Sequence, residues 1–369
     1  MSIVLFLLVL FVLVLVHEWG HYITAKKTGM RVDEFAIGFP PKLFGIKRGE
    51  TDFNFNLLPI GGYVKIYGEN AEEAAEVATQ TRKPEDVGRA FGDRPKWAQA
   101  IVLLAGITMN ILFAWFLFSV TQMVGVPVAV EEANATDAAE LYVAGTLPAS
   151  PAEGKLSVGS VILDISSNGE TLHSPTATEF SNFVATHAPN PVTVHYRFKE
   201  VENTVELTPV KGLATNNPEK YVIGTSLSLV EIQQRGFFDA LGHGFMTTID
   251  GIAGISVGLG SLIKDAFVGQ ADFSTVAGPV GIVGMVGDAA AFGIVPLLTF
   301  TAIISLNLAV VNLLPFPALD GGRLVFVIIE AVTKKQVPPQ WTGWINGVGF
   351  VLLLVLMVAV TFNDISRLL

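Results

Sequence analysis

Residues 3–21 read IVLFLLVLFVLVLVHEWGH, an unbroken apolar run that ends in a polar cluster. A hydrocarbon core about 30 Å thick needs about 20 apolar residues in a helix, and residues 3–25 supply that length. No basic residue precedes the run and no small-residue cleavage site follows it. We therefore expect an uncleaved membrane anchor rather than a signal peptide.

The composition of the whole chain agrees with a membrane protein. Of its 369 residues 51% are hydrophobic and 15% are charged, whereas soluble domains carry about 25% charged residues. Cysteine is absent, which excludes disulfides and thiolate metal ligands. The net charge of -10 argues against a nucleic-acid partner. Much of this chain must face lipid.

Three further apolar stretches, residues 97–126, 295–314 and 341–362, predict a polytopic α-helical membrane protein with about four transmembrane helices. Residues 26–96 hold 12 basic and 11 acidic side chains, and residues 129–290 hold 7 and 18. Because short basic loops stay in the cytosol, we expect both termini and the long acidic segment to be extracytoplasmic.

The long acidic segment contains its own domain. Within residues 132–230, short stretches of alternating polarity separated by turn signals predict one small inserted α+β domain. An interfacial amphipathic helix is expected over residues 236–261. The string Gly278-Pro279-Val280-Gly281 then interrupts an apolar stretch, and we expect a re-entrant or surface-lying loop there.

The polar cluster that ends the first span has the spacing H-E-x-x-H. His17 and His21 lie four residues apart, so a helix places both imidazoles on one face, with Glu18 beside them. Two imidazoles can hold one Zn²⁺ per chain, and a carboxylate can take a proton from water that the metal acidifies. Because ionisable groups are costly inside a membrane span, we interpret the cluster as a metal site.

A catalytic zinc normally has a third protein ligand, and Asp320 is the best candidate. It follows the third span, and Pro315 and Pro317 break that helix before the aspartate. Gly321 and Gly322 then permit a tight turn that can aim the carboxylate inward. We expect Asp320 to lie at the membrane depth of the two histidines.

Together these motifs resemble the site-2 protease family of intramembrane zinc metalloproteases, most closely the regulator-of-sigma-E type. The resemblance rests on H-E-x-x-H in the first span and NLLPFPALDG at residues 312–321. It is strengthened by PIGGYVK at residues 59–65 and AGPVGI at residues 277–282. Ser150-Pro151-Ala152 and the strands around it resemble one PDZ domain, where the family often carries two.

The resemblance implies a division into three parts. Residues 1–126 form the first half of the protease core, residues 127–232 the PDZ-like domain, and residues 233–369 the second half of the core. It also implies roles for single residues: zinc ligands (His17, His21 and Asp320), a general base (Glu18) and an oxyanion or substrate contact (Asn312). Asn307 and Asn110 are expected to make structural contacts within the helix bundle.

The expected function is cleavage of single-span membrane proteins within or near the bilayer, in regulated intramembrane proteolysis. By family resemblance the substrates include anti-sigma factors and signal-peptide remnants. The expected location is the bacterial inner membrane, with the active site near the cytosolic side. Beyond these substrates and membrane lipid, a peptide C-terminus at the PDZ-like domain is an expected partner.

A strand edge is expected to receive the substrate. Residues 51–58 alternate in part, and the prolyl-glycyl segment after them can turn the chain back as a membrane-associated β-hairpin. An extended peptide could pair with its open edge, formed by Gly61, Gly62, Tyr63, Val64 and Lys65. A surface hairpin without a substrate role is the alternative.

Two other functions fit part of the pattern. A zincin-type membrane metalloprotease would carry its third ligand, a glutamate, on a later helix of a soluble domain. A catalytically silent membrane adaptor would use the PDZ-like domain to bind peptides. The adaptor has no need for three ligands together with Glu18, so their joint presence favours the protease.

Overall fold

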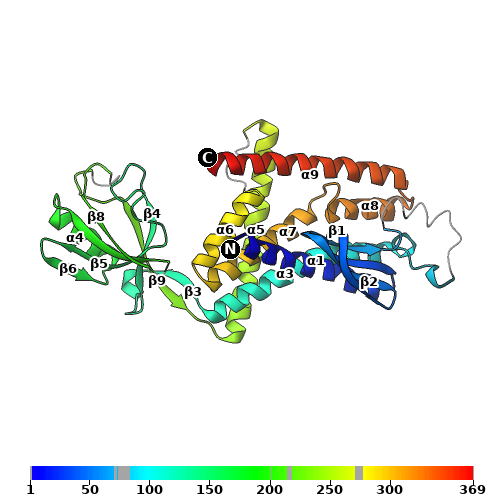
Figure 1. Ribbon diagram of the computed structural model, residues 1–369, viewed down its shortest axis with the longest axis horizontal. Coiled ribbons are helices and arrows are strands. Elements are labelled where there is room, and N and C mark those ends of the chain that lie inside the picture. Colours follow the sequence, from blue (N-terminus) through cyan, green and yellow to red (C-terminus); the bar gives the residue numbers. More distant parts are fainter. Residues whose placement is uncertain are drawn as a thin grey trace. The chain divides into compact units, whose positions relative to one another are not determined.

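The computed structural model describes residues 2–69, 73, 84–199, 201–213, 218–270 and 277–368. Contacts divide the chain into two compact units (Figure 1). The first unit joins Met1–Val120 to Phe237–Leu369, and the second is Thr121–Gly236. The functional division expected at residues 126 and 232 stays a prediction.

Among the described residues, five helices are long and apolar enough to cross a membrane. They are α1 (Ser2–Lys27), α3 (Lys96–Val124), α5 (Phe237–Val268), α7 (Ile294–Leu313) and α9 (Pro339–Leu368). Four of them correspond to the expected spans, and α5 is one more. Glycine, aspartate and histidine side chains lower its mean hydropathy, so the sequence favoured an interfacial helix there. Its 32 continuous residues make it a candidate span.

The expectation of a loop at residues 278–281 is wrong, because Pro279 is the first residue of helix α6 (Pro279–Ala291). Proline is well placed at a first helical position, where its missing N–H breaks no helical hydrogen bond. The carboxylate of Asp364 in α9 accepts hydrogen bonds from the backbone N–H of Gly278, at 3.1 Å, and of Gly281, at 2.8 Å. The segment is therefore the capped start of a helix.

The hairpin consists of β1 (Val32–Arg48) and β2 (Thr51–Ile66). Both strands are long and bent, so that Ala36 lies opposite Asn54 on one side and Tyr63 on the other. The expected hairpin, in which residues 51–58 turn back at the prolyl-glycyl segment, is therefore wrong in its pairing, because residues 52–55 and 62–65 both pair with residues 34–37. Strand β1 is not apparent in the sequence, because Gly38, Pro40 and Pro41 interrupt its strand pattern.

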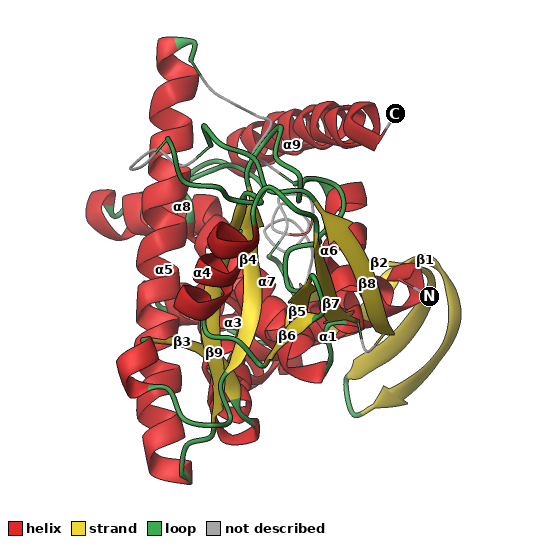
Figure 2. Cartoon of the chain, turned by 90° about the vertical axis from the view of Figure 1, so that its left-hand side faces the viewer, coloured by secondary structure: helices red, strands yellow, loops and turns green. Residues whose placement is uncertain are grey.

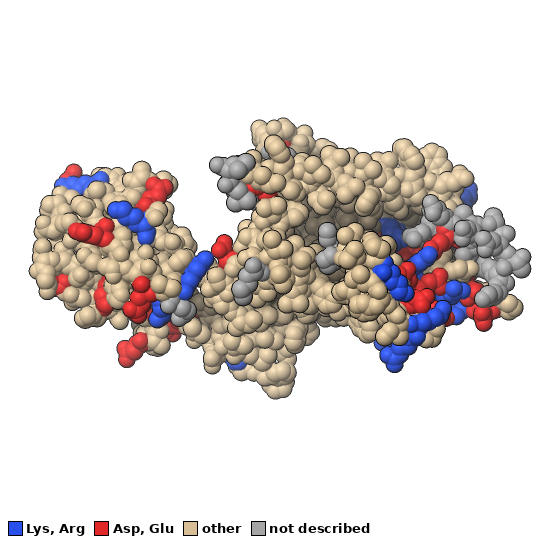
Figure 3. Space-filling model, viewed as in Figure 1, with Lys and Arg blue, Asp and Glu red and all other residues tan. Residues whose placement is uncertain are grey.

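A buried cluster joins the hairpin to the helices that carry the site. Its fully buried members include Ala25 of α1, Val32 and Ile66 of the hairpin, and Val102 of α3. Lys, Arg, Asp and Glu of this unit gather around the hairpin, and the helical surface beside it is nearly free of charge (Figure 3). That distribution is typical of a bundle whose helices face lipid.

The second unit is a sheet with one packed helix, α4 (Ala177–His187). The strand order is β3-β9-β4-β5-β7-β8, with β6 paired to β5. The strands are β3 (Val126–Val130), β4 (Glu140–Thr146), β5 (Val161–Ser167), β6 (Glu170–His173), β7 (Val192–Phe198), β8 (Val201–Leu207) and β9 (Thr225–Gln233). Helix α4 packs on β5 and β9 (Figure 2), and buried Phe180 anchors it in the core.

Candidate metal centre

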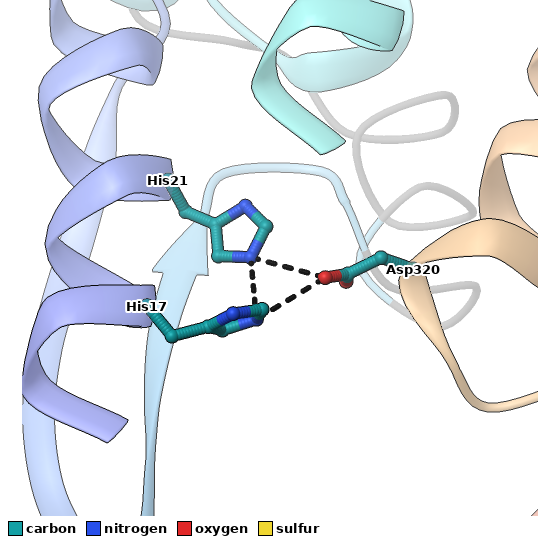
Figure 4. A group of neighbouring side chains, drawn as sticks. All are labelled: His17, His21 and Asp320. Carbon is teal, nitrogen blue, oxygen red and sulfur yellow. Dashed lines mark hydrogen bonds and ion pairs between the residues drawn. The ribbon is translucent and has the colours of Figure 1, made fainter. Parts of the chain in front are cut away.

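Three side chains that are distant in sequence converge in the first unit (Figure 4). His17 and His21 project from adjacent turns of α1, and Asp320 is the first residue of α8 (Asp320–Thr333). Oδ2 of Asp320 lies 3.2 Å from Nε2 of His17 and 3.3 Å from Nε2 of His21. The two Nε2 atoms are 3.1 Å apart.

This triangle has the dimensions of a zinc site. Ligand atoms bound at about 2.0–2.1 Å around a tetrahedral Zn²⁺ lie about 3.3 Å from one another. Oδ2 of Asp320 is buried, and no described residue other than the two histidines offers it a hydrogen-bond donor. In the described part of the chain, no other three potential ligands converge in this way. The donor set of two imidazoles and one carboxylate fits Zn²⁺ with one open position.

The turn between α7 and α8 places Asp320 in this triangle. A Cβ atom at Gly321 would overlap the carbonyl oxygens of Leu313 and Leu314, and one at Gly322 would overlap that of Phe316. The two glycines therefore let α8 start directly against the preceding turn. The side-chain oxygen of Asn346 in α9 accepts the backbone N–H of Ala318 at 3.2 Å, which holds the same turn.

Glu18 is half-buried beside the triangle and interacts electrostatically with His17, His21 and Asp320. The edge segment of β2 passes close to it. A Cβ atom at Gly62 would lie 2.9 Å from Cγ1 of Val14 and 3.5 Å from Cγ of Glu18. The structure thus brings one expected substrate-binding residue next to the expected general base.

The other expected substrate-binding residues lie on the same edge segment. Tyr63 donates a hydrogen bond from its hydroxyl to Oε1 of Glu34 at 2.9 Å, and Nζ of Lys65 lies 2.8 Å from Oε1 of Glu73. Gly61 has a positive φ of 96°, a backbone conformation that favours glycine. Val64 is half-buried. No described strand pairs with the outer edge of residues 61–65.

Asn312 lies in the last turn of α7 and is half-buried. No hydrogen bond joins its side-chain amide to another described residue. The structure therefore does not connect it to the three converging side chains, and its role at the oxyanion stays a prediction.

Helix α3 contacts both histidines of the site, although only a structural contact within the helix bundle was expected of Asn110. The carbonyl oxygen of Val102 lies 2.8 Å from Nδ1 of His21. The side-chain amide nitrogen of Asn110 lies 3.2 Å from Nδ1 of His17. Both α3 residues contact the ring nitrogen that faces away from Asp320. The signal in the sequence is spacing: residues 102, 106 and 110 repeat at the four-residue interval of the two histidines.

An ion pair ties α8 to the loop after the hairpin. Nη1 of Arg323 lies 2.8 Å from Oε1 of Glu69, and Nη2 donates to the Glu69 carbonyl at 3.2 Å. Burial raises the pKa of the Glu69 carboxyl above its usual range, although Arg323 opposes this shift. Because Arg323 is one turn from Asp320, the pair helps to fix the orientation of the α8 N-terminus.

Comparison with known proteins places the chain in a family. The model of peptidase family M50 matches residues 5–356. A Clostridium perfringens protein, named provisionally as a zinc metalloprotease, is 36% identical over 99% of this chain and 98% of its own. The Bacillus subtilis regulator of sigma-W protease RasP is 29% identical over 100% of this chain and 99% of its own.

Solved structures of PDZ domains match part of the chain. The crystal structure of the PDZ domain of an SdrC-like protein from Listeria innocua covers 24% of this chain and 92% of its own, at 18% sequence identity. Its TM-score is 0.20.

Proposed function

Because the chain belongs to peptidase family M50, the site-2 proteases, we propose that it is a zinc endopeptidase that cuts single-span membrane proteins within or near the bilayer. One observation carries the proposal: His17, His21 and Asp320 converge with zinc-like spacing at the end of an apolar helix. The zincin alternative is disfavoured, because the third ligand follows a candidate membrane span instead of lying in a soluble domain. The silent-adaptor alternative does not explain the intact ligand set beside Glu18.

The residues of the site divide the chemistry among them. His17, His21 and Asp320 would hold Zn²⁺, which supplies an acidified water and polarises the scissile carbonyl. Glu18 takes a proton from the attacking water and delivers it to the departing amine. The amide of Asn312 donates a hydrogen bond to the charge that develops on the carbonyl oxygen.

The substrate binds as an extended strand along residues 61–65. A transmembrane helix engages its own carbonyl groups in hydrogen bonds, so a scissile bond must leave the helix before water can attack it. The open edge of β2 offers main-chain partners to the unwound segment. Its position beside Glu18 supports this assignment.

A valine at Gly62 tests the edge strand. The new side chain would meet Cγ1 of Val14 and the carbonyl oxygen of Ala36, each 2.9 Å from its Cβ, and would push the edge away from α1. We expect Gly62→Val to lower kcat/KM for synthetic single-span peptides about tenfold or more, since a misplacement of about 1 Å can cost a factor of about 10². Zinc content should not change.

Gly92→Val is the matched control, because nothing lies within 4 Å of a Cβ atom at Gly92. It should cleave the same peptides at the wild-type rate. Equal kcat/KM for Gly62→Val and Gly92→Val would remove the strand from the substrate path.

We place the protein in the bacterial inner membrane, with both termini and the second unit extracytoplasmic, α5 at the membrane surface instead of crossing it, and the active site near the cytosol. Lys and Arg counts on the two sides of the spans support this orientation. Anti-sigma factors and signal-peptide remnants are the proposed substrate classes. The name of the Bacillus subtilis relative, regulator of sigma-W protease RasP, is consistent with the first class.

The second unit acts as a size filter that excludes substrates with bulky extracytoplasmic domains. A second role, binding a peptide C-terminus, is favoured by a pocket between α4 and the start of β9. Phe180 and Val184 line one wall, and residues 221–225 with Leu227 line the other. Residues 225–228 of β9 pair with β4, whereas β3 pairs only from Leu229 onward. A peptide can therefore add to this free edge.

Removing the second unit separates the two roles. Val130 and Leu229 lie opposite each other in the β3–β9 ladder, so residues 131–228 can be replaced by a two-residue Asn-Gly turn. If the unit is a filter, the shortened protein should cleave substrates with intact ectodomains about as fast as it cleaves trimmed substrates.

If the unit binds peptide ends, the same deletion should instead slow the cleavage of trimmed substrates. Both rates are measured on one single-span protein with and without its ectodomain. Wild-type rates on both substrates would show that the unit has neither role.

A further inference from the structure

We infer that Asn110 is a positioning residue that holds His17 in the tautomer able to bind a metal ion through Nε2. The inference rests on the zinc site of the proposed function. Asn110 is fully buried in α3, and its side-chain amide lies 3.2 Å from Nδ1 of His17. No described group forms a hydrogen bond with its Oδ1 atom.

The two histidines need the same protonation pattern. A neutral imidazole that binds a metal through one nitrogen carries its proton on the other, and an acceptor at the second nitrogen fixes this tautomer. For His21 the acceptor is the Val102 carbonyl, 2.8 Å from Nδ1. A carbonyl can only accept, so Nδ1 of His21 is protonated and Nε2 is left for the metal.

His17 presents Nε2 to the same centre, so its Nδ1 also needs an acceptor. The side-chain amide of Asn110 is the group placed there. Its Oδ1 becomes the acceptor after a half-turn of the amide, which costs little space because the oxygen and nitrogen are nearly equal in size. No other described group forms a hydrogen bond with Oδ1, so rotating the amide breaks no hydrogen bond at that atom.

Helix α3 is built to approach α1 at this level. Its residues 102, 106 and 110 share one face because they are four apart, and they lie opposite His21 and His17. A Cβ atom at Gly106 would lie 2.7 Å from Cε1 and 2.8 Å from Nε2 of His17, so only glycine permits this approach. Oγ of Ser305 in α7 donates to the Asn110 carbonyl at 2.8 Å, which fixes the same turn of α3.

The test is zinc affinity, measured on the purified full chain in detergent by competition with a chromogenic chelator. Asn110→Ala removes the acceptor, and we expect zinc to bind about 10–100-fold more weakly. Asn110→Asp keeps an acceptor of the same shape, so it should stay within about threefold of wild type. The visible spectrum of bound Co²⁺ should change in Asn110→Ala and not in Asn110→Asp.

Asn307→Ala is the matched control. Asn307 is exposed on α7, and among the described residues it donates only to the Ile303 carbonyl of its own helix, at 2.9 Å, so its loss should leave zinc affinity unchanged. Thermal unfolding of each variant reports whether it is folded. If Asn110→Asp does not fold, the comparison of Asn110→Ala with Asn307→Ala decides.

Wild-type zinc affinity in Asn110→Ala would overturn the inference and leave the zinc site intact. Equal weakening in folded Asn110→Ala and Asn110→Asp would also overturn it, since an acceptor would then not matter. A wild-type protein that binds no more zinc than Asp320→Ala would overturn the zinc site itself.

Discussion

Glu18→Gln is expected to slow peptide-bond hydrolysis by about 10²–10⁴-fold while zinc stays bound. Glutamine has nearly the shape of glutamate but cannot accept a proton from the attacking water. Glu18 is not one of the three converging ligands, so its replacement leaves Nε2 of His17 and His21 and the carboxylate of Asp320 in place. The measurement is single-turnover cleavage of synthetic single-span peptides, with zinc quantified on the same sample.

Glu202→Gln is the control for this prediction, because Glu202 is an exposed glutamate of the second unit. It should cleave at the wild-type rate. A near-wild-type rate for Glu18→Gln would show that another group accepts the proton.

The second large effect is loss of the metal. Asp320→Ala removes one of the three ligand atoms that lie 3.1–3.3 Å apart. Two imidazoles on one helix hold zinc far more weakly than the full set of three ligands that a catalytic site provides. We expect zinc to fall from about one per chain to near zero after dialysis, and cleavage to be abolished. His17→Ala and His21→Ala should behave in the same way.

His243→Ala serves as the control, since His243 is half-exposed on α5 and pairs with Asp239 of the same helix. It should keep both zinc and activity. Full zinc retention together with full activity in Asp320→Ala would remove the third-ligand assignment.

The parts of the site that follow from local geometry were predictable from sequence. His17 and His21 share a face because a helix repeats every 3.6 residues. Asp320 could be selected because prolines and glycines around it interrupt a span where few other carboxylates occur. Its place beside the histidines is a tertiary fact, and it depends on the close approach that Gly321 and Gly322 allow.

Features that depend on packing between distant segments were not predictable in the same way. The spacing of residues 102, 106 and 110 marks one face of α3, but it does not show that this face packs against α1, and only that apposition gives Asn110 a contact with His17. Strand β1 was missed because Pro40 and Pro41 argue against a strand, although its pairing with β2 on two sides overrides that local preference.

The sequence favoured an interfacial helix over α5 for a compositional reason. The glycines and charged side chains of α5 dilute its apolar pattern, so its full length became visible only in the structure. Similarly, a Gly-Pro pair is common both in loops and at helix starts. The cap that Asp364 provides from α9 selects the helix start for α6.

The central claim is that this chain cuts single-span membrane proteins through Glu18 and the three converging ligands. Quantitative membrane proteomics of otherwise identical cells that carry wild type or Glu18→Gln tests it most directly. The account predicts that membrane-retained stubs of a few single-span proteins accumulate only in the Glu18→Gln cells and disappear when wild type is restored. Identical sets of membrane fragments in the two strains, with both proteins present at equal amounts, would contradict it.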